Sequence, residues 1–67
     1  MARRAFVDSI IEDPAKTFTH GPTDVLRDRR FTPQDRVDIL EAWDRKDPGI
    51  ESIILALSEA REKLPKE

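Results

Sequence analysis

This chain lacks the residues from which small proteins usually build covalent staples and metal sites. It has no cysteine, so disulfide bonds and thiolate metal sites are excluded. Its single histidine, His20, cannot form an ordinary histidine-based metal site without help from carboxylates. A chain of 67 residues buries only a marginal core. Of the usual sources of extra stability, only self-association or a partner protein remains.

Glycine and long apolar runs are also scarce. The two glycines, Gly21 and Gly49, each stand beside a proline at an expected turn, which excludes a glycine-rich phosphate loop. The longest apolar run, Ile53 to Leu57, is far too short to cross a bilayer. The residues that follow Met1 are interrupted by acids and do not form the apolar stretch of a signal peptide. We therefore expect no membrane span and a cytoplasmic location.

The chain has no excess of charge of one sign. Twelve Lys and Arg residues stand against fourteen Asp and Glu residues, for a formal net charge of −2. This balance does not supply the overall positive field expected of a nucleic-acid binder. Because 39% of the residues are charged, carboxylate clusters are expected to be solvated surface rather than metal sites. We expect no metal and no other cofactor.

The residues that are present recur with helical spacing. Proline and capping residues divide the apolar pattern into four short helices, at about residues 3–12, 22–29, 33–46 and 48–64. The segment 15–20 is expected to be an irregular connector that carries Phe18 as an apolar anchor. We predict one small all-α domain over residues 1–67, a four-helix array that either stands as a monomer or is completed by dimerisation.

The third helix has the clearest start. Thr32 is a suitable N-cap, Pro33 suits the first helical position, and Asp35 places a carboxylate near the positive end of the helix. Thr-x-x-Asp is a weaker form of the capping box. The apolar residues of this helix span an arc of roughly 160°, formed by Val37, Ile39, Leu40 and Trp43. Such a wide arc predicts packing against two neighbours.

The fourth helix is predicted from a similar signal. Asp47 is expected to cap it, with Pro48 at the first helical position. A continuous apolar stripe is expected to follow, formed by Ile50, Ile53, Ile54, Leu57, Ala60 and Leu64. Leu55 lies well off this stripe and is expected to extend a partner-binding surface.

One pattern covers roughly residues 18–47 and consists of Phe18, Pro22, Asp24-Val25-Leu26, Asp28, Phe31-Thr32, Arg36-Val37, Ile39-Leu40 and Trp43. This pattern resembles a family of small, uncharacterised, all-helical proteobacterial proteins. Where that family carries a Glu-Gly-Met element after the tryptophan helix, this chain has Asp47-Pro48-Gly49-Ile50-Glu51. The resemblance implies an all-helical fold in a bacterial cell, and it implies no activity.

Catalysis has little support in the sequence. His20 is the only conventional general base near neutral pH, and it stands in an expected loop before Gly21-Pro22. Four short helices also leave little room for a substrate pocket. We expect no catalytic residues and no enzymatic activity.

Two functional hypotheses remain. The first is a non-enzymatic interaction or regulatory module that binds a protein partner or a second copy, as a homodimer, through Phe31, Ile39, Trp43 and Leu55. The competing interpretation is that Phe31 and Trp43 are simply core of a monomer. The second hypothesis is a DNA- or RNA-associated regulator that uses Arg27, Arg29, Arg30 and Arg36. Acids on the third helix would face phosphate unfavourably, and an arginine cluster paired with nearby aspartates is the simpler account.

Overall fold

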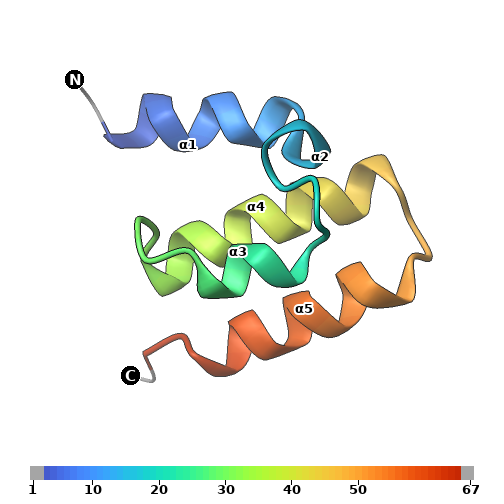
Figure 1. The fold of residues 1–67 in the computed structure, drawn as a ribbon. Coiled ribbons are helices and arrows are strands. Elements are labelled where there is room, and N and C mark those ends of the chain that lie inside the picture. The colour runs from blue at the N-terminus through green and yellow to red at the C-terminus, as the bar shows by residue number, and fades with distance from the viewer. Residues whose placement is uncertain (1–2, 66–67) are drawn as a thin grey trace.

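The described residues form helices joined by short turns and contain no strand, which confirms the predicted all-α class. The computed structural model describes residues 3–65, so the remaining residues of the predicted domain, Met1, Ala2, Lys66 and Glu67, lie outside the described residues. The helices in chain order are α1 (Arg3–Glu12), α2 (Pro14–Thr17), α3 (Thr23–Arg27), α4 (Pro33–Lys46) and α5 (Glu51–Glu62) (Figure 1).

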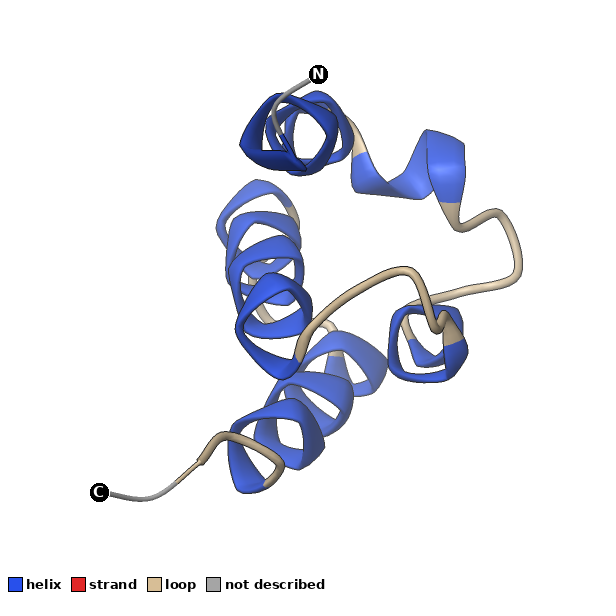
Figure 2. Cartoon of the chain, turned by 90° about the vertical axis from the view of Figure 1, so that its left-hand side faces the viewer, coloured by secondary structure: helices blue, strands red, loops and turns tan. Residues whose placement is uncertain are grey.

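Helix α4 forms the centre of the fold. It packs against each of the other helices, with α1 and α5 on opposite sides of it (Figures 1 and 2). Its wide apolar arc explains this position, because every part of the arc needs a neighbour to exclude water. The buried side chains of α4 include Val37, Ile39, Leu40, Ala42 and Trp43. The sequence predicted two neighbours, and the structure gives α4 more than that.

The rings of Phe6, Phe31, Phe18 and Trp43 form one row that runs from the surface at Phe6 into the core. Phe6 of α1 stacks on Phe31 with ring centroids 5.6 Å apart. Phe31 meets the edge of Phe18 at 6.1 Å, and Phe18 in turn stacks on Trp43 of α4 at 6.3 Å. The rings come from separate segments: Phe6 lies in α1, Phe18 follows α2 and Phe31 precedes α4. Their contacts therefore hold α1 and the segments before α3 and before α4 against α4.

The predicted start of α4 is confirmed in detail. The Thr32 hydroxyl accepts a hydrogen bond from the Asp35 backbone N–H at 3.1 Å, and the Asp35 carboxylate accepts one from the Thr32 N–H at 3.1 Å. Pro33 occupies the first helical turn. This reciprocal capping box satisfies two backbone donors that the helix itself leaves without partners.

The expected irregular connector after α1 contains a helical turn instead. Pro14 begins α2, and the Phe18 N–H donates to the Pro14 carbonyl at 2.9 Å. A helix of four residues carries no readable apolar period, so its sequence gave no helical signal. The turn carries Phe18 back over α4, where its ring is buried.

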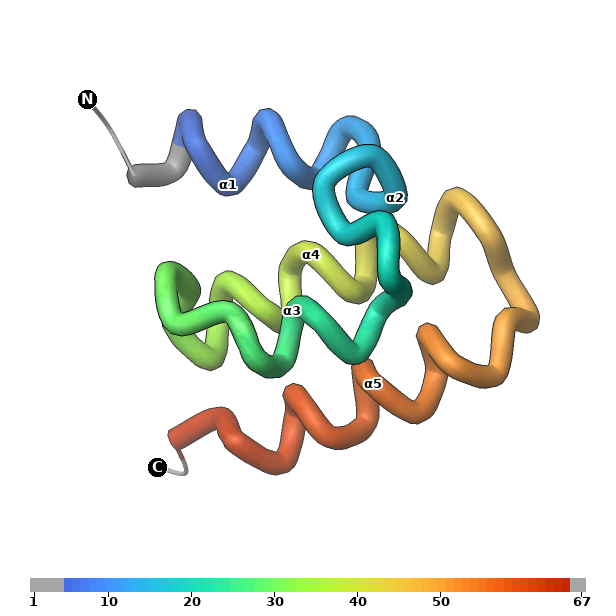
Figure 3. Tube along the Cα trace, in the orientation of Figure 1, coloured from blue at the N-terminus to red at the C-terminus, as the bar shows by residue number. Residues whose placement is uncertain are grey.

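The predicted start of the last helix is wrong. Asp47 is the C-cap of α4, and its N–H donates to the Trp43 carbonyl at 2.9 Å. Gly49 then adopts a φ of +83°, which side chains rarely tolerate, and the chain reverses (Figure 3). Helix α5 starts only after Ile50, whose carbonyl accepts from Ile53 and Ile54. The Asp-Pro-Gly segment is therefore a turn between helices.

The boundaries of the shorter elements are narrower than predicted. Helix α3 covers Thr23–Arg27 rather than 22–29, because Asp28 has extended backbone angles. Helix α5 ends at Glu62 rather than residue 64. The N–H groups of Lys63 and Leu64 donate to the carbonyls of Ala60 and Arg61, three residues earlier, as in a 3₁₀ turn.

The capping box gives a direct stability test. Replacement of the cap, Thr32→Ala, is expected to lower the free energy of unfolding by about 1 kcal/mol, because the Asp35 N–H loses its acceptor. The matched variant Asp47→Ala is expected to change it by less than about 0.5 kcal/mol, since that side chain caps no helix start. Urea unfolding followed by circular dichroism measures both. An equal loss for the two variants would contradict the observed start of α5.

Candidate functional site

Three of the four predicted partner-binding residues are buried within the chain. Phe31, Ile39 and Trp43 expose 4%, 0% and 6% of their surface. The neighbouring rings and helices of the same chain cover them, so the competing interpretation of Phe31 and Trp43 as monomer core describes their position. The prediction that these three side chains face a partner is therefore corrected. Leu55, the fourth, is 62% exposed.

Helix α5 is the element with an uncovered apolar side. Its core-facing side chains, Ile53, Ala56, Leu57 and Ala60, are buried against α3 and α4. Two residues of the predicted apolar stripe, Ile50 and Ile54, are 45% and 48% exposed, and Ala56, which the stripe did not include, is buried. We call the exposed residues on the side of α5 away from the core its outer face: Glu51, Ile54, Leu55, Ser58 and Glu62.

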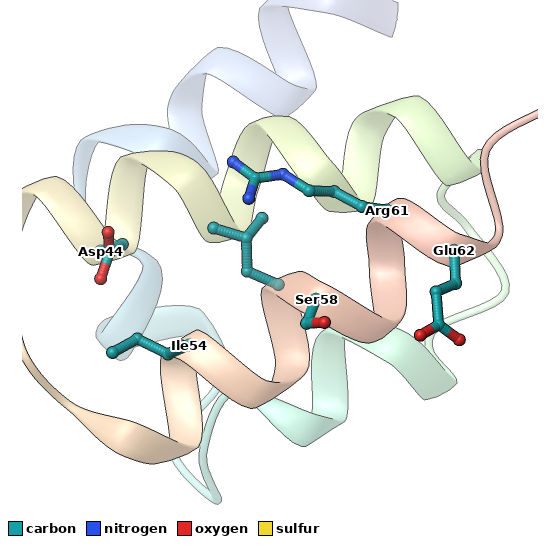
Figure 4. Close-up of a pocket in the computed structure, with 6 residues that line it drawn as sticks. Asp44, Ile54, Ser58, Arg61 and Glu62 are labelled. Atoms are coloured by element: carbon teal, nitrogen blue, oxygen red, sulfur yellow. The ribbon is translucent and has the colours of Figure 1, made fainter.

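The outer face borders a groove between α4 and α5. The groove has a volume of about 540 Å³ and is lined by Asp44, Ile54, Leu57, Ser58, Arg61 and Glu62 (Figure 4). Asp44 and Ile54 lie toward one end and Glu62 toward the other. Leu57 is buried and forms part of the apolar wall. The groove is wide enough for side chains of another molecule, and its composition is aliphatic with acidic ends.

One ion pair bridges the two helices that form this groove. The Arg61 guanidinium donates to the Glu41 carboxylate at 3.0 Å, and both side chains are exposed. The antiparallel arrangement of α4 and α5 brings Arg61 to Glu41, which lies 20 residues earlier in the chain. An exposed pair of this kind contributes at most about 1 kcal/mol. Arg61, the cation that lines the groove, is therefore already paired. Asp44 and Glu62 have no ion-pair partner among residues 3–65.

A second, smaller groove lies on the other side of the outer face. It has a volume of about 200 Å³ and is lined by Thr23, Leu26, Ser52, Leu55, Ala56 and Glu59. Its walls are α3 and α5. Ile54 and Leu55 therefore stand on a ridge between two grooves, one on each side.

The predicted arginine cluster lies at the junction of α3 and α4, and Asp28 organises it. Arg30 donates to both carboxylate oxygens of Asp28, with a shortest contact of 2.6 Å. The Arg30 guanidinium also lies 5.4 Å from the ring centroids of Phe6 and Phe31. These contacts fix Arg30 in the fold as a cation over aromatic rings.

Arg36 is also engaged within the chain. Its Nη2 donates to the Asp28 carbonyl at 2.9 Å, and its Nε is buried without a hydrogen-bond partner among the described residues. Arg27 and Arg29 are exposed. Of the four arginines predicted to contact nucleic acid, Arg30 and Arg36 therefore bond to Asp28, although the Arg30 side chain stays 58% exposed, and Arg27 and Arg29 face solvent.

The Asp28 ion pair shifts the acidity of both partners. Hydrogen bonds from the Arg30 side chain hold the pKa of Asp28 below its ordinary value, although partial burial opposes this, and the Arg36 charge adds to the lowering. In return, Asp28 raises the pKa of Arg30. A carboxyl with a lowered folded pKa stabilises the fold above its unfolded pKa, near 3.9, and loses that contribution as the pH falls through the folded pKa.

The residues considered for catalysis and metal binding do not converge. His20 is exposed in the turn before α3. Among residues 3–65, no three His, Asp or Glu side chains come together in a way that could hold a metal ion. In the same range, no helix combines the length and the apolar character needed to cross a membrane.

The ion pair predicts a pH-dependent difference between two proteins. Asp28→Asn keeps a side-chain acceptor for the Arg30 N–H but removes the charge, so it is expected to lower the free energy of unfolding by about 1 kcal/mol at pH 7. The difference is expected to shrink as the pH falls below about 4, because Asp28 of the unfolded wild-type chain then binds a proton that the folded state, with its lowered pKa, resists. Urea unfolding across pH 2.5–7 measures it. A constant difference across this range would contradict the assignment to the ion pair.

Comparisons with known proteins add no relative. No protein-family model, no curated protein and no solved structure matches the chain. The resemblance of residues 18–47 to a proteobacterial helical family stays a prediction. Function is therefore argued from the surface of the molecule.

Proposed function

We propose that this protein is a small non-enzymatic interaction module that binds a protein partner through the outer face of α5. One observation carries the proposal: Ile54 and Leu55 stand exposed side by side on the ridge of α5, at 48% and 62%. Most other large apolar side chains of this short chain are buried. The exposed pair is thus set apart from the core.

The packing of α5 makes this pair suitable for recognition. Ile53 and Leu57 hold the helix on α4 from the core side, so the outer face is presented by a rigid element. Full burial of an aliphatic side chain contributes about 1.5–3 kcal/mol. A face with two such residues therefore favours reversible binding of modest affinity rather than a permanent complex.

A DNA- or RNA-associated regulator is the second candidate, supported by the exposed Arg27 and Arg29. It is weaker, because Arg30 and Arg36 are already bonded to Asp28. The guanidinium groups of Arg30 and Arg36 would have to share their N–H donors between these internal bonds and phosphate. The expectations of a non-enzymatic role and a cytoplasmic location stay predictions.

A pair of surface variants tests the proposed role of α5. Leu55→Ser is expected to leave the free energy of unfolding within about 0.5 kcal/mol of wild type, since the side chain is exposed. It is expected to reduce capture of the cellular partner by tagged protein at least fivefold, about 1 kcal/mol. The matched control is Ala5→Ser, also exposed but on α1. Equal capture by Leu55→Ser and wild type would remove α5 as the binding surface.

Self-association is distinguished by mass. Sedimentation equilibrium over a concentration series is expected to give a mass near 7.7 kDa throughout. A mass that rises with concentration, and that Leu55→Ser returns to the monomer value, would make a second copy the occupant of the outer face.

The nucleic-acid candidate makes a different prediction. If it holds, the double variant Arg27→Glu, Arg29→Glu weakens binding to mixed-sequence DNA or RNA and lowers its salt dependence, since fewer counterions are released. Fluorescence anisotropy at low salt measures this. Absence of binding by the wild-type protein at low salt would exclude the candidate.

A further inference from the structure

We infer that the partner segment is a short amphipathic α-helix with basic flanks, bound in the groove between α4 and α5. This inference rests on the proposed function, and it adds the chemistry of the partner and its place. It follows from the shape of the groove, its apolar wall and the charges at its ends.

The shape favours a helix over an extended strand. The described residues form helices and no strand, so no sheet edge is presented to which a strand could add. The groove instead lies between two antiparallel helices, α4 and α5, and its lining follows α5 from Ile54 to Glu62 (Figure 4). Helix α5 has 12 residues, a length of about 18 Å, so a partner helix of about three turns would lie along it.

The wall of the groove offers aliphatic contacts on one side. Ile54 is half exposed, and Leu57 continues the apolar surface toward the floor. A partner helix with aliphatic residues at helical spacing would cover these side chains and remove Ile54 from water. Ser58, between them and Glu62, is small enough to allow close approach.

The charges at the ends define the flanks of the partner. Asp44 and Glu62 lie toward opposite ends of the groove and have no ion-pair partner among the described residues (Figure 4). The cation of the groove, Arg61, is already paired with Glu41 at 3.0 Å. The site is therefore complementary to a helix that carries Lys or Arg at both ends of its apolar stripe.

The same charges disfavour a second copy of this chain. An α5 from another molecule would bring its own Glu51, Glu59 and Glu62 toward an acidic surface. Stable interfaces also bury about 800 Å² on each partner, whereas the exposed large apolar side chains of this face are Ile54, Leu55 and the adjacent Ile50. A basic partner complements the acidic ends of the groove better than a second copy does.

Two designed peptides test the inference with defined probes. Each is a helix of about 14 residues with leucine at i, i+3, i+4 and i+7 spacing, and the remaining positions are lysine in one peptide and glutamate in the other. Nuclear magnetic resonance titration of isotope-labelled protein locates binding and measures affinity. The lysine peptide is expected to bind roughly tenfold more tightly than the glutamate peptide. Its shifts are expected around Asp44, Ile54, Ser58 and Glu62.

A charge-reversal pair sharpens the assignment. The double variant Asp44→Lys, Glu62→Lys is expected to weaken the lysine peptide roughly tenfold and to reverse the preference between the peptides. Both acids lie near the C-terminal ends of their helices, where lysine suits the helix dipole, so the variant is expected to fold. The control Glu12→Lys, Asp13→Lys makes the same change in net charge at the end of α1 and is expected to keep the wild-type preference.

The outcomes separate this inference from the proposed function. Equal affinity for the two peptides, absence of binding by either, or shifts centred on residues 27–36 would overturn the basic-helix assignment. If cellular capture still depends on Leu55 in that case, the interaction module stands and only the chemistry of its partner is wrong. If capture ignores Leu55 and the lysine peptide nevertheless binds the groove, the proposed α5 ridge fails instead.

Discussion

The burial of α4 on almost every side is the constraint on which this structure depends. The apolar arc of α4 is too wide for one neighbouring helix to cover. The chain also has no cysteine, so no disulfide bond can hold the helices in a different arrangement. Each of the other helices therefore covers part of α4. The row of rings from Phe6 to Trp43 fills the space where α1 and the two connectors meet it. The capping box at Thr32 determines where this central helix begins.

This use of α4 determines what is left for a surface. Aromatic residues are common binding anchors, but three of the four in this chain, Phe18, Phe31 and Trp43, contribute to the core. Helix α5 is covered by α3 and α4 and by no other described helix, so its outer face stays open. Ile54 and Leu55 lie there because one side of α5 is enough to complete the core. The candidate surface is thus a consequence of how a small fold distributes a limited number of helices.

The charged side chains at the α3–α4 junction and those at the groove between α4 and α5 differ in how far they are paired within the chain. At the junction of α3 and α4, Asp28 bonds Arg30 and accepts from Arg36, so the basic residues there largely stabilise the fold. At the groove, the ion pair between Arg61 and Glu41 leaves Asp44 and Glu62 unpaired among the described residues. Local pairing, rather than net charge, decides which charged groups can meet a partner. The net charge of −2 alone predicts neither the paired arginines at the junction nor the unpaired acids at the groove.

The sequence by itself determined the features that depend on neighbours along the chain. The helical period of α1 and the Thr32-Pro33-Asp35 start of α4 are local, and both were predicted correctly. Asp47-Pro48 was misassigned because the same residues can end one helix or start the next, and the left-handed Gly49 decides between them. The pattern also marked Phe31, Ile39 and Trp43 as residues to be buried. Only the tertiary structure decided that they are covered by the same chain while Leu55 stays exposed, because burial in a core and burial at an interface require the same apolar side chains.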